Sequence, residues 1–554
     1  MTGRSTAFGD EGTGVFRRLG NLAMELGTSL TGGGSTSFTG VAPALPALMA
    51  GNPAIAQQLY RGIYRFAGHT VECQPTQIFE AAAPTAAWSD GLHGFAWLSH
   101  LEAPGLALYR AFARSLVQNW AAQRRRTSFD ASCRRLMSLS RHAGFVLSGA
   151  SAQFESRFLY LVTREAVQIA RLRPRGTAQQ LRQSIAVLTA ALAFRGGGSL
   201  GNDALARTAS LIASVILPDG GPADRSPKSL LDLLADLVPL RAAMEAQRIA
   251  IPQGLNAAME RAIPMLRMLC HGDEGLAVFH GVEHTSAAIV RAIFEHDVVQ
   301  GSPLSHAAQS GYCRMSQGQS IVIADCGAPA ICDSALAFEF SDGPQRIVGS
   351  CGVPANASPA WQAAARTPAA HSTLRLDNES IKNSKPVFSR KTTREPASPV
   401  TAELFDLPQG TLVKARSAVH SASGLIHHRE IFLASGGHDL RGEDSIERSG
   451  ADRPANFIIR FHLHPAIKAS ANRKGAAIIL LLPNKEAWQF SARGGAMMLE
   501  ESIYLASGAG PRHSWQIVVR GAAQASARIN WAFRKLERQA RHNGATGAAP
   551  QLPF

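Results

Sequence analysis

Apolar residues recur at three- and four-residue spacing from about Trp88 to Glu295, and this period predicts amphipathic helices. The breaks between them contain glycine and proline, and one helix starts with the N-cap pair Ser226-Pro227. The helices are expected at residues 105–121, 128–147, 152–172, 179–194, 203–216 and 226–246. Helical hairpins on this scale suit an α/α toroid, although the period alone equally allows a bundle or a solenoid.

After about Gly301 the apolar period changes to two, which predicts β-strands separated by turn residues. The expected strands are residues 321–324, 336–340, 426–433, 457–463, 477–482, 502–505, 515–519 and 528–533. Many strands at short intervals favour a sandwich. Residues 378–399 are polar, basic and broken by proline, so we expect an exposed loop there.

These two patterns predict an N-terminal α/α toroid followed by a C-terminal antiparallel β-sandwich. The toroid is expected at residues 61–298 and the sandwich at 299–543. Residues 1–60 are expected to form a partly flexible lead-in, and residues 544–554 a disordered tail.

The formal net charge of +15 favours an anionic partner or surface, such as a glycan, a nucleic acid or an anionic lipid. Two arginine clusters stand out, Arg124–Arg126 and the alternating set Arg171, Arg173 and Arg175. Scattered solvated arginines would explain the charge equally well. Nucleic-acid binding rests on charge alone, because no recognisable module accompanies it.

Seven cysteines are widely scattered without a Cys-x-x-Cys pair, which argues against a disulfide framework and for a reducing compartment. The first residues lack the apolar core of a secretory signal, so the expected location is cytoplasmic, with the periplasm or cell envelope as the alternative. No apolar run is long enough to span a bilayer, so stable membrane insertion is not expected.

The most informative segment runs from Ile331 to Asn378. Two alternating strands, 335–340 and 346–350, are joined by a Ser-Asp-Gly turn, and His371 enters a third strand after a loop. The segment contains the runs Ala335-Leu336-Ala337-Phe338-Glu339, Arg366-Thr367 and Ala370-His371-Ser372-Thr373, with Gly352 between them. It resembles the C-terminal β domain of the heparinase II/III family, bacterial lyases that act on uronic-acid polysaccharides.

The resemblance extends into the helical half, through WSDGLHGFAWLSHLE, ILPDGG and the RSPKSLLDLLADL helix, and covers roughly Ala67 to Trp531. It implies that this chain lacks several family groups. Ala178 and Gln179 stand where the family has an Asn-His pair, and Ser229 stands where it has a catalytic tyrosine. Ala330 and Cys332 replace a histidine pair.

The resemblance also implies a position for zinc, which some members of the family bind. Cys332, Ser350 and His371 stand at the ligand positions, and serine is a poor zinc ligand. We therefore expect no cofactor and no zinc. His462 and His464 alternate on a predicted strand and so point to the same face, but packed or solvated histidines are the default interpretation.

Uronate lyases cleave by β-elimination, which needs a base, an acid and a group that stabilises the developing carboxylate charge. The expected catalytic residues are His371, Tyr312 and His93. The expected substrate-binding residues are Arg366, as a carboxylate clamp, and Trp97 and His100, which lie on one helical face with His93 at i, i+4 and i+7. The alternatives are a structural histidine bound to a carbonyl, a core tyrosine and a packed aromatic stripe.

The leading hypothesis is a polysaccharide lyase-like protein that acts by β-elimination on an anionic, uronic-acid-containing polysaccharide. The alternative is a non-catalytic glycan-binding or envelope-biogenesis protein with a degenerate lyase site. Both predict an anionic polysaccharide as partner and no nucleic acid.

Overall fold

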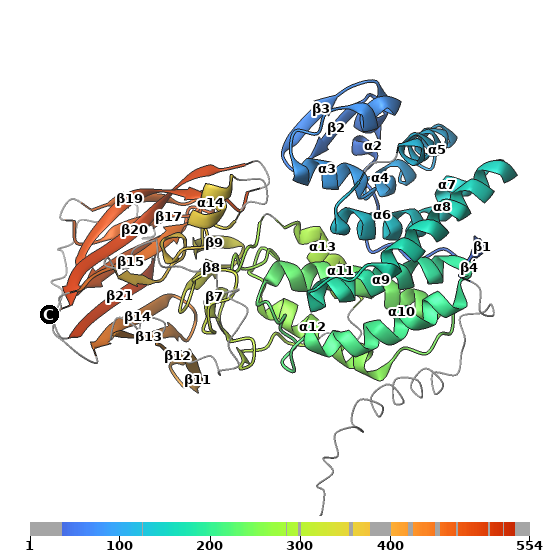
Figure 1. Ribbon diagram of the computed structural model, residues 1–554. Coiled ribbons are helices and arrows are strands. Elements are labelled where there is room, and N and C mark those ends of the chain that lie inside the picture. The colour runs from blue at the N-terminus through green and yellow to red at the C-terminus, as the bar shows by residue number, and fades with distance from the viewer. Residues whose placement is uncertain are drawn as a thin grey trace, which may run out of the picture.

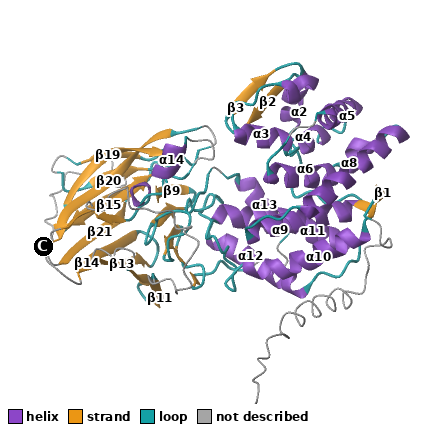
Figure 2. Cartoon of the chain, in the orientation of Figure 1, coloured by secondary structure: helices purple, strands orange, loops and turns teal. Residues whose placement is uncertain are grey.

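The computed structural model describes residues 36–123, 126–283, 285–296, 301–353, 358–376, 400–418, 425–448, 455–472, 475–507, 510–523 and 526–537. The predicted loop at 378–399 and the predicted tail at 544–554 lie outside these residues. Two lobes make up the molecule, with helices gathered in one and strands in the other (Figures 1 and 2). This is the predicted order of an α/α toroid followed by antiparallel sheets.

The helical lobe contains antiparallel helices in hairpins, several of them started by a hydroxyl side chain that accepts a backbone N–H, such as Ser128 and Ser151. Its helices are α2 (Pro53–Tyr60), α3 (Ala86–His93), α4 (Leu98–Glu102), α5 (Ala107–Ala122), α6 (Phe129–Arg141), α7 (Ala143–Leu147), α8 (Ala152–Arg171), α9 (Thr177–Ala193), α10 (Gly198–Leu211), α11 (Pro227–Ala246), α12 (Gln253–Met268) and α13 (Ala287–Glu295). In the described part of the chain, no helix combines the length and the apolar character needed to cross a bilayer.

Part of the expected lead-in belongs to this lobe. Strand β1 (Phe38–Val41) pairs with β4 (Phe194–Gly196) at the end of α9, and the Phe38 ring stacks on Phe194. A small hairpin, β2 (Ile63–Phe66) and β3 (His69–Glu72), packs its Phe66 ring against Trp88 of α3. Phe38, Ala56 and Leu59 of the expected lead-in are therefore part of the helical core.

The second lobe stacks two antiparallel sheets. One sheet has the order β19-β20-β15-β9-β8-β7-β6-β5, with β10 also paired to β15, and the other has the order β11-β12-β13-β14-β21-β18-β17-β16. The strands are β5 (His306–Ala307), β6 (Tyr312–Gln317), β7 (Ser320–Asp325), β8 (Phe338–Asp342), β9 (Gln345–Gly349), β10 (Leu374–Leu376), β11 (Thr401–Leu407), β12 (Gly410–Ser417), β13 (Leu425–Ala434), β14 (Asp439–Arg448), β15 (Ala455–Leu463), β16 (Lys468–Ala471), β17 (Ile478–Leu481), β18 (Ala487–Arg493), β19 (Ala496–Tyr504), β20 (Arg512–Ala523) and β21 (Ser526–Leu536). Helix α14 (Pro359–Ala364) precedes β10.

An aromatic cluster joins the two sheets. Trp531 of β21 stacks on Phe338 of β8 with ring centroids 5.1 Å apart, and Phe461 of β15 meets both rings edge-on. The same interior contains one buried ion pair, in which Arg429 binds Asp444 through two nitrogens. The apolar faces of both sheets thus close on one core.

Charged side chains connect the two lobes. Arg225, just before α11, is ion-paired with the fully buried Asp325 at the end of β7, and its carbonyl accepts the Tyr312 hydroxyl at 2.6 Å. Asp219 accepts the backbone N–H groups of Gln309 and Ser310. Together these bonds fix the sandwich against the end of the helical lobe.

Candidate functional site

A cavity of about 400 Å³ lies where the first turns of α9 and α11 face the segment that follows β7. Ala178 of α9, Ser229 of α11 and Ala330 line it together. These are the positions at which the family resemblance implies the asparagine of an Asn-His pair, a tyrosine and the first histidine of a histidine pair. The fold therefore brings these three positions together in one cavity, which is called the cleft below.

The groups that remain in this cavity are unsuited to proton transfer. Ser229 Oγ donates to Asp224 Oδ2 at 2.7 Å, and Asp232 and Asp236 are ion-paired with Lys228 and Arg141. Arg182 is ion-paired with Asp130, the other lining residues are mainly aliphatic, and no imidazole, phenol or amide side chain is among the described lining residues. A histidine or tyrosine base for the proton next to a uronate carboxylate is therefore lacking from this lining.

His371 does not line this cavity and is almost completely buried. Its Nδ1 is 3.1 Å from Ser350 Oγ, and the Ala365 backbone also contacts the ring. Burial, together with the neighbouring His280 and His462, lowers the pKa of His371 to about 3. The ring is therefore neutral and sequestered.

The implied zinc position does not fit the ion. His371 and Ser350 bind each other directly, and burial raises the pKa of the Cys332 thiol to about 12, which leaves it protonated. Within the described ranges, no three His, Cys, Asp or Glu side chains are grouped to hold a metal. The donor set at this position is one imidazole, one alcohol and one thiol.

Tyr312 on β6 is fully buried, with its hydroxyl on the Arg225 carbonyl and its ring 5.9 Å from Phe279. Burial raises the pKa of this phenol well above its usual value. The side chain connects the two lobes and has no route to a ligand.

The expected helical face of His93, Trp97 and His100 does not form. Helix α3 ends at His93, Phe95 takes a left-handed φ of 60°, and α4 starts only at Leu98. The prediction of one continuous helix here is wrong, because this left-handed residue breaks the i, i+4, i+7 register. His93 and Trp97 are buried, and His100 Nδ1 accepts the Asn52 N–H at 2.9 Å.

Arg366 is exposed just after α14, and its carbonyl accepts the Asp333 N–H. None of the four cavities described for this chain is lined by any of the six expected site residues. The sequence analysis did not identify the cavity at Ser229 as a site, although the family resemblance had already singled out three of the residues that line it.

Arginines from both clusters line a wider groove of about 750 Å³. Arg126 before α6 and Arg171 and Arg173 at the end of α8 line it, with Gln179 of α9 at its border. The three arginines are exposed, whereas the carboxylate in the groove, Glu165, is buried and paired with Arg135. The groove is therefore electropositive and adjoins the cleft across the first turn of α9.

Comparisons with known proteins agree on the architecture. Residues 299–532 match the family model described as Heparinase II/III-like, C-terminal. The solved structure of heparinase III superimposes with a TM-score of 0.71 at 13% identity, covering 95% of this chain and 90% of that one. A mutant of the heparan sulfate lyase HepC from Pedobacter heparinus gives 0.63 at 12% identity, covering 95% and 89%.

One related protein has a name that refers to localisation rather than to a lyase activity. FtsZ-localized protein C from Caulobacter vibrioides is 29% identical over 487 residues, which are 83% of this chain and 84% of the relative. Residues 299–532 therefore form a heparinase II/III-like C-terminal domain, and the whole chain shares the toroid-plus-sandwich fold of heparinase III.

Proposed function

We propose that this chain is a non-catalytic member of its family that binds an anionic polysaccharide without cleaving it. The observation that carries the proposal is the lining of the cleft, in which Ala178 and Ser229 stand where the resemblance implies an asparagine and a catalytic tyrosine, and which holds no imidazole or phenol among its described residues. The two strongest alternative catalysts, His371 and Tyr312, are buried and lie outside the cleft.

The arginine groove supports an anionic polymer as the partner. Arg126, Arg171 and Arg173 come from two separate segments and face one groove, where their fields add. A guanidinium binds carboxylate and sulfate groups through paired N–H donors. Binding at such an exposed surface is expected to weaken as salt is added.

The relative's name supports a role at the division site. Because that protein is named for its localisation with FtsZ, we infer that this chain acts with the division machinery, as an envelope-biogenesis protein rather than a degradative enzyme. A fluorescent fusion should co-localise with FtsZ; an even distribution throughout dividing cells would contradict this part of the proposal.

The activity test uses the intact chain with heparan sulfate, chondroitin sulfate, alginate and bacterial uronic-acid polymers. We expect no rise in the ultraviolet absorbance that an unsaturated uronate produces. A sustained rise that tracks the purified protein would overturn the non-catalytic proposal and restore the lyase hypothesis.

The binding test compares two charge reversals. The pair Arg171→Glu and Arg173→Glu should weaken binding of the same polymers at least tenfold at low salt, whereas Arg207→Glu, at an exposed position of α10 outside the groove, should change it little. Equal losses in both variants would mean that net charge, rather than the groove, determines binding.

A further inference from the structure

A separate cavity of about 470 Å³ lies where the ends of several strands of the nine-stranded sheet meet the connector between α12 and α13. Strand ends supply Tyr504 from β19, Arg512 from β20, His464 just after β15 and Arg346 from β9. These four strands are neighbours in the sheet, and Tyr504 is the direct register partner of Arg512. Three separate parts of the sequence, around residue 346, around residue 464 and in the β19–β20 hairpin, are thus brought together at one end of the sheet.

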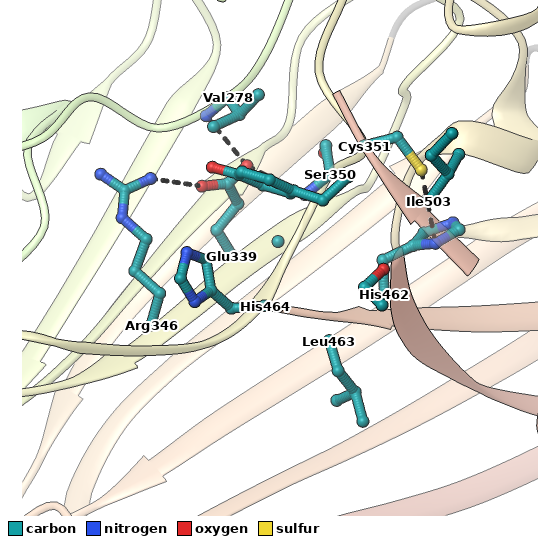
Figure 3. A pocket seen from close by; sticks show the side chains of 12 residues that line it. Val278, Glu339, Arg346, Ser350, Cys351, His462, Leu463, His464 and Ile503 are labelled. Carbon is teal, nitrogen blue, oxygen red and sulfur yellow. Dashed lines mark hydrogen bonds and ion pairs between the residues drawn. The ribbon is translucent and has the colours of Figure 1, made fainter. Parts of the chain in front are cut away.

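Arg346 forms part of the wall rather than a free donor. Its Nε and Nη2 bind the Asp273 carboxylate at 2.8 and 3.0 Å, and its Nη1 binds the Leu276 carbonyl at 2.8 Å. The buried Glu339 lies beside it and accepts the Val278 N–H (Figure 3). These bonds hold the connector against the sheet and fix the shape of the cavity.

Three other side chains at these strand ends, His464, Tyr504 and Arg512, are available as hydrogen-bond donors. His464 Nδ1 accepts the Ala466 N–H at 3.3 Å, so in the neutral ring Nε2 carries the hydrogen. Burial, with Arg346 close by, lowers the pKa of His464 to about 4, and burial raises the pKa of Tyr504 to about 12, so both are neutral donors. The exposed Arg512 supplies the positive charge.

The connector supplies the opposite wall, with the Glu283 carboxylate and the hydroxyls of Thr285 and Ser286. Because Asp273 and Arg346 neutralise each other, Arg512 and Glu283 are the charged groups that remain among the described lining residues to meet a ligand. A highly charged polymer would be repelled by Glu283, whereas a small acid with hydroxyl groups satisfies both walls. The volume falls within the range of small-molecule sites.

We propose that this junction cavity binds a sugar acid of one or two units, with its carboxylate on Arg512, Tyr504 and His464 and its hydroxyls toward Glu283. The site is separate from the cleft and from the arginine groove, so it goes beyond the glycan binding proposed above. Because both lobes line it, the ligand also ties the sandwich to the helical lobe.

Calorimetric titration of the intact chain with D-galacturonate, D-glucuronate and D-galactose tests the proposal. At least one acid should bind ten- to a hundredfold more tightly than galactose, since a charge-assisted hydrogen bond is lost in the neutral sugar. Thermal unfolding should shift upward with that acid, because the ligand binds the folded state. Failure of both acids to bind, or equal binding of galactose, would overturn the proposal.

Matched variants locate the site. Arg512→Gln and Tyr504→Phe should each weaken acid binding about tenfold or more, whereas Arg520→Gln, exposed on the same strand but paired with Glu500, should not. The Arg171→Glu and Arg173→Glu pair should leave acid binding unchanged. If that pair abolishes it instead, the acid occupies the arginine groove and the junction proposal fails, while the proposed glycan binding still stands.

Discussion

Replacing Arg225 by methionine tests whether the two lobes depend on the ion pair between them. The guanidinium is paired with Asp325, whose side chain is fully buried, and also donates from Nε to the Ser310 carbonyl at 2.7 Å. Methionine keeps much of the volume but leaves a carboxylate inside the protein without its main cation. Breaking a buried pair in this way costs about 3–5 kcal/mol, a large part of the ~5–15 kcal/mol that stabilises a typical protein.

Urea unfolding followed by circular dichroism measures the loss, with Arg528→Met as the control. Arg528 is 72% exposed and pairs with Glu443 at the surface, where such a bond contributes about 0.2–1 kcal/mol. The double variant Arg225→Met, Asp325→Leu should be more stable than Arg225→Met alone, because it leaves no uncompensated charge. Equal losses for Arg225→Met and Arg528→Met would refute this account of the junction.

Two further predictions concern the sandwich. The pKa values of His371 and His462 are lowered to about 3 and about 4 by burial, so the unfolded chain binds more protons between about pH 6.5 and pH 4. The free energy of unfolding should be highest above about pH 6.5 and should fall by several kcal/mol as the pH drops to about 4, because each unit of pKa shift corresponds to about 1.4 kcal/mol. A urea midpoint that stays constant from pH 6.5 to pH 4.5 would argue against buried neutral rings. Gly442→Ala should lower the free energy of unfolding by about 1–3 kcal/mol, because the new Cβ would lie 2.0 Å from the Trp531 ring. Gly144→Ala is the control, since a Cβ there meets nothing within 4 Å. Equal melting temperatures for the two variants would contradict the packing argument.

The sequence predicted the elements whose periodicity is undisturbed. The segment 152–172 is α8 almost to the residue, and 457–463 lies within β15, because one apolar face of each element is buried in a core. Strand β14 was missed, since its interior positions carry polar groups. Asp444 of β14 is inside the sandwich as the partner of Arg429, so the expected alternation of apolar residues is absent there.

The site was only partly predictable for a related reason. The resemblance named Ala178 and Ser229 as replaced positions, and the structure places them in one cavity. His371 lies on the expected segment, but its burial depends on packing from other strands, which no local pattern records. The junction cavity was out of reach, because Tyr504 and His464 meet only through sheet order.

The packing between the lobes affects how this protein can be dissected. The apolar interior of the toroid continues through Tyr312, Ile323 and Ala337 to Ala506, just after β19. Expressing residues 299–554 alone would uncover that surface to water, so the fragment is expected to aggregate. The effects of truncating this chain would then come from misfolding of the remaining fragment. Single-residue variants are therefore better suited to testing the function of each lobe.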